Sequence, residues 1–247
     1  MFPPRAGVPH PKVTSALKVA VILVAAGSGV RLGAGVPKAF APLCGESLLA
    51  HALRGVLGCG EVGHVIIVAP ASHVDQCWAV AGHSRVDAGH SRVDVVSGGL
   101  DRSASVEAGL AALRPDDGIV LVHDVARCLA PSDLFARVID AVRAGHSAVV
   151  PGLPVTDTVK VIDAQGRVLT TPDRDSLRGI QTPQGFLREV LEQAHASGAS
   201  ATDDAGLVER TGGPVRVVAG DHRALKITSP LDLTVAAALL QDGSYVG

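Results

Sequence analysis

Val19-Ala-Val-Ile-Leu-Val24 leads directly into Ala25-Ala-Gly-Ser-Gly-Val-Arg-Leu-Gly-Ala-Gly-Val-Pro-Lys-Ala-Phe40, so an apolar strand is followed at once by a glycine-rich loop. Glycine has no side chain, and the glycines at 27, 29, 33 and 35 therefore let backbone N–H groups approach an anion closely. Arg31 and Lys38 add positive charge to the same loop. The segment predicts a phosphate-binding loop at the end of a first buried strand.

The spacing of these glycines separates the loop from two common phosphate-binding patterns. No Gly-Lys-Ser/Thr occurs, so the loop is not that of the P-loop nucleoside-triphosphatases. Gly27, Gly29 and Gly33 do not fit the Gly-x-Gly-x-x-Gly pattern of dinucleotide folds. An NAD-dependent reductase would also need an acidic ribose partner after the second strand. Asp75 could fill that role, but the loop spacing argues against this reading.

Outward from this loop, short β-branched runs alternate with amphipathic stretches. Continuous apolar strands separated by helices predict an α/β fold, with a Rossmann-like, mostly parallel sheet sandwiched by helices. Ligands of such sheets bind at the carboxyl ends of the strands. The expected strands and helices, in order, are Val19–Val24, Ser47–Leu57, Val65–Val68, Ser72–Val80, Val93–Val96, Ser103–Leu113, Ile119–Val122, Pro131–Ala144 and Ala148–Val150.

The rhythm changes after Pro151. Two short runs, Thr158–Ile162 and Arg167–Thr171, flank Asp163-Ala-Gln-Gly166 and predict a hairpin that a parallel core does not need, which we interpret as an arm over residues 153–175. Helices are expected at Gln184–Ala196 and Asp203–Arg210, a strand at Val215–Val218, and a last helix from the cap Ser229 to Leu240. We expect a flexible tail over residues 1–16 and one domain over residues 17–242, because the tail is rich in proline and poor in apolar periodicity.

Composition excludes several classes of protein. The net charge of -2 provides no cationic field for a polyanion, and 2% aromatic residues leave no platform for base stacking, so no nucleic-acid partner is expected. The apolar run Val19–Ala26 is far shorter than a membrane-spanning helix, and no membrane partner is expected. Four cysteines without a Cys-x-x-Cys pair favour reduced thiols and a cytoplasmic location.

A heptapeptide occurs twice in tandem, as Ala81-Gly-His-Ser-Arg-Val-Asp87 and again as Ala88-Gly-His-Ser-Arg-Val-Asp94. Two copies are too few for a solenoid. We interpret them as a duplicated surface loop before a strand, and no chemistry is assigned to their two histidines.

Two further segments place polar groups where strands are expected to end. Gly98-Gly-Leu-Asp-Arg-Ser-Ala-Ser-Val106 follows a strand, and its backbone amides and the Ser105 hydroxyl could meet a base or a ribose; the alternative is an ordinary helix cap by Ser103 or a neighbour. Leu121-Val-His-Asp-Val-Ala-Arg127 puts Asp124 at the carboxyl edge. A single carboxylate there suits Mg²⁺, which completes its shell with phosphates and water, although Asp124 could instead cap the following turn.

The loop order Gly-x-Gly-x-Arg, followed by Pro37-Lys38, resembles that of nucleotidyltransferases that make activated sugars and alcohols. Over Val19 to Leu240 the chain is similar to one family of that superfamily, the 2-C-methyl-D-erythritol 4-phosphate cytidylyltransferases of non-mevalonate isoprenoid synthesis. The resemblance rests on Gly98-Gly, Arg102-Ser-Ala-Ser105, His123-Asp124 with Arg127, Asp157-Thr-Val-Lys160, Asp173-Arg174, Gln181-Thr-Pro-Gln184, Thr202-Asp-Asp204 and Leu225-Lys-Ile-Thr228.

The resemblance implies transfer of CMP from CTP to 2-C-methyl-D-erythritol 4-phosphate, giving 4-diphosphocytidyl-2-C-methyl-D-erythritol and pyrophosphate. It implies Mg²⁺ or another divalent cation at Asp124, and a homodimer in which the arm reaches the partner's site. The implied catalytic residues are Arg31, Lys38, Arg174 and Lys226; the implied nucleotide-binding residues are Ala25, Ala26, Gly27, Gly29, Gly99 and Ser105; the implied acceptor-binding residues are Arg127, Thr158, Arg174, Thr202 and Thr228.

Four positions depart from the family pattern: Leu100, Val125, Cys128 and Ala39. Alternatives of related chemistry are a cytidylyltransferase for ribitol 5-phosphate or another polyol phosphate, and a sugar-1-phosphate transferase that uses UTP or GTP. An alternative of another class is a catalytically silent CTP-binding module. The presence of Lys38, Asp124 and Lys226 favours an enzyme.

Overall fold

A computed structural model describes residues 17–26, 36–84 and 91–242. The tail expected over residues 1–16 lies outside the described residues. So does the stretch 27–35 of the predicted phosphate loop, which contains the predicted site residues Gly27, Gly29 and Arg31.

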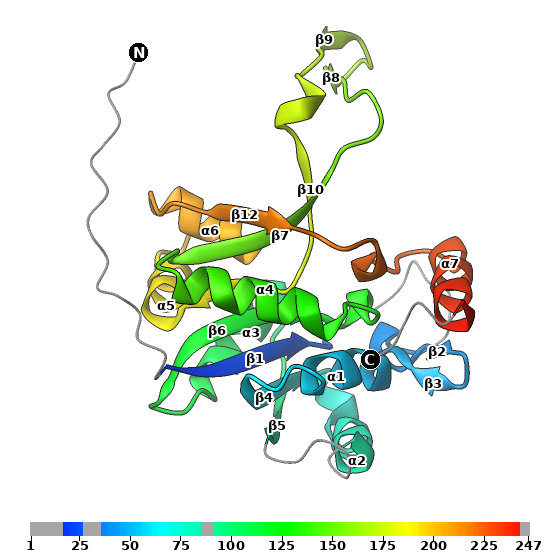
Figure 1. Ribbon diagram of the computed structural model, residues 1–247, viewed down its shortest axis with the longest axis vertical. Helices are drawn as coiled ribbons and strands as arrows, with labels where there is room; N and C mark the ends of the chain where they lie inside the picture. Colours follow the sequence, from blue (N-terminus) through cyan, green and yellow to red (C-terminus); the bar gives the residue numbers. More distant parts are fainter. Residues whose placement is uncertain (1–16, 27–35, 85–90, 243–247) are drawn as a thin grey trace.

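One central sheet organises the part of the chain that the structure describes (Figure 1). Its strands follow the order β10-β7-β11-β6-β1-β4-β5, with β12 also paired to β7. The pairs β1/β4, β1/β6, β4/β5 and β12/β7 are parallel, whereas β11 and β10 run antiparallel to their neighbours. The predicted Rossmann-like α/β class is therefore confirmed. The strands span Lys18–Val24 (β1), Val62–Ala69 (β4), Arg92–Ser97 (β5), Asp117–Asp124 (β6), Ala148–Pro154 (β7), Arg178–Ile180 (β10), Gln184–Leu187 (β11) and Arg216–Ala219 (β12).

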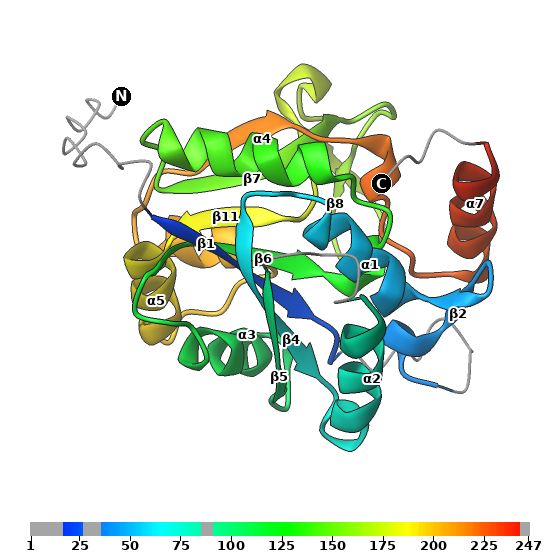
Figure 2. The same cartoon turned by 60° about the horizontal axis from the view of Figure 1, so that its bottom comes forward.

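Helices cover both faces of this sheet, with α4 and α3 on opposite sides (Figure 2). Strand β1 shows why two layers form: Val19, Val21 and Leu23 belong to one buried cluster, and Ile22 belongs to the other. Side chains alternate between the faces of a strand, so each face of β1 needs its own apolar cover. The helices span Leu48–Leu57 (α1), Val74–Ser84 (α2), Arg102–Ala111 (α3), Ser132–Arg143 (α4), Arg188–Ala196 (α5), Asp204–Arg210 (α6) and Pro230–Gln241 (α7).

Short elements connect these layers. The small hairpin of β2 and β3 lies beside α7 in both views of the ribbon. Their bounds, with those of the 3-10 turns, are Lys38–Phe40 (η2), Pro42–Leu43 (β2), Glu46–Ser47 (β3), Ala71–His73 (η3), Val125–Arg127 (η4), Arg174–Ser176 (η5) and His222–Ala224 (η6). No helix among the described residues is long and apolar enough to cross a bilayer.

The parallel register aligns the carboxyl ends of four neighbouring strands. Val24 pairs with both Val68 and Asp124, and Val68 pairs with Val96. The segments that follow β1, β4, β5 and β6 therefore leave the sheet at the same edge, as ligand-binding α/β sheets require. This carboxyl edge is where the predicted loops meet.

An arm projects from the sheet, as the sequence predicts (Figure 1). It contains β8 (Val161–Ile162) and β9 (Val168–Thr170), which pair antiparallel with each other, and returns through η5 to β10. The paired strands are shorter than the expected Thr158–Ile162 and Arg167–Thr171. Gly166 has φ +80° in the connecting turn, a conformation that favours glycine.

The helix expected at Gln184–Ala196 is wrong in its first turn. Residues Gln184–Leu187 form β11, a buried antiparallel strand between β6 and β7, and α5 begins only at Arg188. The space beneath α4 explains the difference, because a Cβ at position 185 would lie 2.5 Å from Val138 Cγ1, and glycine alone passes there. The expected cap at Ser229 is confirmed, since its side chain and that of Asp232 form a capping box.

A buried polar cluster joins three strands at the opposite, amino edge of the sheet. His64 lies 2.6 Å from Asp117 Oδ2 through Nδ1 and 3.0 Å from Asp94 Oδ2 through Nε2. His64 and Asp117 have no exposed side-chain surface. The cluster links β4, β5 and β6 far from the carboxyl edge, so we treat it as part of the framework.

The duplicated heptapeptide is partly described. Its first copy begins within α2, which continues to Ser84 rather than ending at Val80 as expected, and its second copy enters β5 at Arg92. Residues 85–90 lie outside the described residues.

Candidate active site

Asp124 is the last residue of β6, at the carboxyl edge of the sheet. Its Oδ2 accepts a hydrogen bond of 2.8 Å from Lys226 Nζ, and its Oδ1 lies 3.5 Å from Nε and Nη2 of Arg102. Burial opposes ionisation of this carboxyl, but the positive charges of Arg102 and Lys226 outweigh it and lower the pKa of Asp124 to about 2. Asp124 is therefore an ionised, partly shielded carboxylate at neutral pH.

Lys38 and Lys226 meet at this edge although 188 positions of sequence separate them. Lys38 Nζ donates a 2.7 Å hydrogen bond to the carbonyl of Ile227, the residue next to Lys226. The N–H of Ile227 in turn donates to the carbonyl of Ala126, two residues after Asp124. The structure thus brings together three of the predicted phosphate-handling residues.

The loop between β5 and α3 packs against the end of β1. A Cβ at Gly98 would lie 2.7 Å from Ala26 Cβ, so glycine allows the two segments to touch. The N–H of Gly99 donates to Ser105 Oγ at 3.2 Å, and this hydroxyl donates to the carbonyl of Asp101 at 2.7 Å. Ser105 is buried and shapes the loop. The helix cap is Asp101, which accepts from the N–H of Ala104, and not Ser103.

Ala25 and Ala26, two of the predicted nucleotide-binding residues, directly follow β1 at the carboxyl edge. The N–H of Ala25 donates to the carbonyl of Val68 at 2.9 Å and thereby continues the pairing of β1 with β4. Ala26 is half-buried and lies next to Gly98. Both residues border the position at which the glycine-rich loop leaves the strand.

Arg127 lies in η4, three residues after Asp124, with its guanidinium on backbone carbonyls. It donates to Ala224 at 2.7 Å and to Ile180 at 3.1 Å. Burial lowers the pKa of Arg127, and the nearby Asp124 carboxylate opposes that effect. In this conformation Arg127 fixes η4 against β10 and η6.

Arg174 and Thr158 both lie on the arm, which projects away from the carboxyl edge of the same chain (Figure 1). Arg174 donates to the carbonyl of Thr156 at 2.9 Å, and this contact joins the two sides of the arm. Thr158 is exposed between β7 and β8.

The other two predicted acceptor contacts flank the edge. Thr202 is exposed just before Asp203, the N-cap of α6. Thr228 lies two residues after Lys226, and its N–H and hydroxyl both donate to Asp232 at 2.7 and 2.8 Å. Thr228 thereby fixes the segment that carries Lys226 to the start of α7.

Comparison with known proteins shows which family this chain belongs to. A family model described as 2-C-methyl-D-erythritol 4-phosphate cytidylyltransferase matches residues 19–242. The chain belongs to this family. The Nocardia farcinica protein of that name is 51% identical over 222 residues, which cover 90% of this chain and 94% of that protein, and the Saccharopolyspora erythraea protein of that name is 50% identical over 228 residues, covering 91% and 100%.

Solved structures agree with this assignment. The 4-diphosphocytidyl-2C-methyl-D-erythritol synthase of Anaerococcus prevotii superposes with a TM-score of 0.79 at 31% identity, covering 92% of this chain and 100% of that one. The family predicted from the motifs is therefore confirmed, and so is the enzyme class, a methylerythritol phosphate cytidylyltransferase.

Arg102 and Asp204 belong to the family motifs and also contribute to the site. Arg102, the first residue of α3, lies between Asp124 and Asp204, and its Nη2 is 2.7 Å from Asp204 Oδ2. Burial opposes the positive charge, but Asp204 and Asp124 outweigh it and raise the pKa of Arg102. The sequence pattern does not predict the contact between Arg102 and Asp204, because it joins the starts of two helices that are far apart in the chain.

His123 and Thr182 support Asp124 from behind. Thr182 Oγ1 lies 3.0 Å from His123 Nδ1 and accepts the N–H of Asp124 at 3.1 Å. Burial lowers the pKa of His123 to about 4, so the imidazole is neutral at pH 7 and adds no charge to the candidate site.

Three of the four departures from the family pattern are core positions. Ala39, Val125 and Cys128 are between 1% and 2% exposed, so they pack inside the protein. Leu100 differs, because it is fully exposed on the loop that carries Gly99. It is the departure that lies where a ligand could touch it.

The donors at the edge fit a divalent cation that is shared with phosphates. The described residues contain no group of three or more His, Cys, Asp or Glu that could hold a metal by themselves. Asp124 supplies one ionised carboxylate, and Mg²⁺ commonly binds proteins through one or two carboxylates while phosphates and water complete its octahedron. Asp124 is thus suited to hold Mg²⁺ once a nucleotide is present.

Proposed function

We propose that this chain joins CTP to 2-C-methyl-D-erythritol 4-phosphate at the edge marked by Lys38, Asp124 and Lys226. The observation that carries the proposal is the convergence of these residues, with Lys226 Nζ 2.8 Å from Asp124 and Lys38 Nζ 2.7 Å from the carbonyl next to Lys226. A lysine on the carboxylate and a second lysine on the adjoining backbone suit a triphosphate with its metal ion.

The chemistry needs alignment more than proton transfer. A phosphate monoester is already an ionised nucleophile at neutral pH, so no general base is required. Lys38 and Lys226, with Arg31 of the glycine-rich loop, would offset the charge that develops around the α-phosphorus and on the leaving pyrophosphate. Mg²⁺ held by Asp124 would add positive charge beside the triphosphate.

The cytidine would lie against the loop between β5 and α3. Gly99 and the segment Ala25–Gly29 supply backbone groups to the nucleotide in this proposal, and Ser105 holds the N–H of Gly99 in place. Arg127 of η4, Thr202 just before α6 and Thr228 just before α7 border the same edge, and there they would bind the acceptor phosphate.

A homodimer would complete the acceptor site. Four apolar side chains on the hairpin of the arm, Val161, Ile162, Val168 and Leu169, are between 43% and 64% exposed. A two-stranded hairpin with such a surface is only marginally stable alone and is typical of a protein interface. The same arm carries Thr158 and Arg174 away from their own Asp124, so we infer that they serve the partner's site.

The remaining parts of the proposal concern the domain and its location. Residues 17–242 would act as one nucleotidyltransferase domain, in keeping with a family match over residues 19–242. A cytoplasmic location is supported by four free cysteines, three of them buried apart from one another.

Pyrophosphate release tests the proposal. Purified protein is incubated with Mg²⁺, one nucleotide (CTP, UTP or ATP) and one acceptor (methylerythritol phosphate or ribitol 5-phosphate). Release with CTP and methylerythritol phosphate alone is expected. Preference for ribitol phosphate would refute the acceptor, and no release from folded protein with any pair would refute the enzyme assignment.

A further inference from the structure

Arg102 contacts two carboxylates at different distances. Its Nη2 lies 2.7 Å from Asp204 Oδ2, whereas its closest approach to Asp124 is 3.5 Å. Nε and Nη2 of Arg102 donate hydrogen bonds to Asp124 Oδ1, but both are long, whereas charge-assisted N–H···O bonds are usually about 2.7–2.9 Å long. The closest contact of the guanidinium is therefore its ion pair with Asp204, and it stands at the limit of bonding distance from Asp124. Lys226 is the cation that bonds Asp124 closely, at 2.8 Å.

Asp204 is anchored more firmly than either cation. It is fully buried at the start of α6, and its second oxygen accepts a 3.0 Å hydrogen bond from Nε2 of His195 on α5. His195 is itself nearly buried, with 3% of its side chain exposed. Arg102 is thereby held from α6 through a carboxylate that cannot move without breaking this contact.

Lys226 differs in this respect. Its side chain is 45% exposed, and its bond to Asp124 is open to solvent. A divalent cation that binds Asp124 must displace a positive group from its oxygens, and Lys226 is free of the anchoring that fixes Arg102. The displaced ammonium would then be available to the phosphates.

We propose that Asp204 is a positioning residue: its charge holds the Arg102 guanidinium back at 3.5 Å from Asp124 Oδ1, so that a divalent cation can exchange with Lys226 at this carboxylate. The inference rests on the proposed function of Asp124 as the metal-binding carboxylate. Without Asp204 the guanidinium would shorten its two 3.5 Å contacts with Asp124 to the close, two-pronged pairing that arginine and carboxylate favour, and it would compete with the metal.

Mn²⁺ binding in the presence of CTP, followed by electron paramagnetic resonance, tests this directly. Asp204→Asn should raise the dissociation constant for Mn²⁺ about tenfold, the lower end of what loss of an outer-shell partner does to a metal site. The double variant Arg102→Met/Asp204→Asn removes the competing guanidinium and should restore the constant to within about twofold of wild type, because a buried ion pair replaced as a unit is tolerated.

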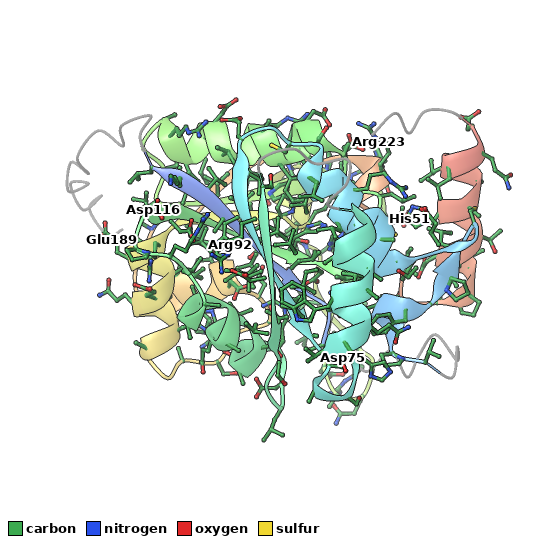
Figure 3. All side chains as sticks on the ribbon, turned by 90° about the horizontal axis from the view of Figure 1, so that it is seen from below. His51, Asp75, Arg92, Asp116, Glu189 and Arg223 are labelled. Atoms are coloured by element: carbon green, nitrogen blue, oxygen red, sulfur yellow. The ribbon has the colours of Figure 1, made fainter. Side chains whose placement is uncertain are left out.

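Two further variants control for folding and for charge. Asp116→Asn removes an ion pair with Lys18 before the opposite end of β6 and should leave Mn²⁺ binding unchanged; Asp116 lies on the other side of the molecule from α7 (Figure 3). If Asp204→Asn fails to fold, Asp204→Glu replaces it. Its extra methylene keeps the charge but moves the guanidinium toward Asp124, and a weaker loss of Mn²⁺ affinity is expected.

Unchanged Mn²⁺ affinity in a folded Asp204 variant would overturn the inference while leaving the metal site intact. A double variant as weak as Asp204→Asn would overturn it as well, since Arg102 would not be the competitor. Failure of the wild-type protein to bind Mn²⁺ with CTP would instead remove the metal site of the proposed function, and the inference with it.

Discussion

Replacing Lys226 by methionine tests the electrostatics of the site most fully. The substitution keeps the length of the side chain and removes the charge that lies 2.8 Å from Asp124. Lowering the pKa of Asp124 from 3.8 to about 2 corresponds to about 2 kcal/mol of stabilisation of the ionised form. Arg102 and Lys226 share this effect, so the variant should lose about 1 kcal/mol of unfolding free energy at pH 7.

The sign of the pH dependence follows from the lowered pKa. A carboxyl whose pKa is lower in the folded than in the unfolded state stabilises the fold above the unfolded value, near pH 4, and this contribution is lost as the pH falls through about 2. The difference between wild type and Lys226→Met should therefore be constant from pH 5 to 8 and shrink below pH 4. Urea unfolding across this range measures it.

The same variant should lower kcat for pyrophosphate release by at least about a hundredfold, because Lys226 would stabilise charge that develops in the reaction. Lys18→Met is the matched control: Lys18 pairs with Asp116 beyond the amino end of β6, and its loss should leave kcat unchanged. A normal kcat in folded Lys226→Met, or a stability difference that persists at pH 2, would refute the reasoning.

The remaining predictions concern the nucleotide loop, the framework, the arm and the metal. Gly99→Ala places a Cβ 2.3 Å from Ala104 Cβ and should raise the KM for CTP about tenfold in initial-rate assays, whereas Gly60→Ala, with open space around it, should not. Asp117→Asn disturbs the buried 2.6 Å hydrogen bond to His64 and should lower the free energy of urea unfolding by about 2 kcal/mol while kcat stays normal; a change below about 1 kcal/mol would contradict this. Leu169→Lys charges the exposed hairpin and should shift sedimentation from dimer to monomer with loss of activity, and an active monomer would exclude the shared site. Treatment with EDTA should abolish pyrophosphate release and added Mg²⁺ should restore it, so activity that survives EDTA would exclude the metal.

Much of the fold could be predicted from the sequence, because strands that are buried on both faces are continuously apolar. Val19–Val24 is apolar throughout, and β1 lies in the middle of the sheet with helices on either side. The capping residues Ser47, Asp203 and Ser229 likewise act locally, through N–H groups within the next turn. Such features need no knowledge of distant parts of the chain.

The strand Gln184–Leu187 shows where local patterns fail. Its four residues continue smoothly into α5, and their pairing with β6 and β7 depends on strands that lie far away in the sequence. Gly185 is required by Val138 on α4, a contact that propensity does not encode. Tertiary packing decides this segment.

In the candidate site, too, residues in local motifs could be predicted, whereas contacts that depend on tertiary packing could not. Lys38, Asp124 and Lys226 could be predicted because each lies in a short motif of its family, and the structure brings them together. The pairing of Arg102 with Asp204 could not, since it depends on how α3 and α6 are placed around β6. The roles of Thr158 and Arg174 stay predictions, because they depend on the proposed homodimer.

Transfer of labelled CMP tests the central claim most directly. The enzyme is incubated with Mg²⁺, methylerythritol phosphate and CTP labelled with ³²P at the α-phosphorus, and the products are separated. The account predicts that all consumed label appears in a diphosphate-linked cytidine product, and only when the acceptor is present. Label released as CMP, or label retained in CTP by a folded enzyme with both substrates, would contradict it.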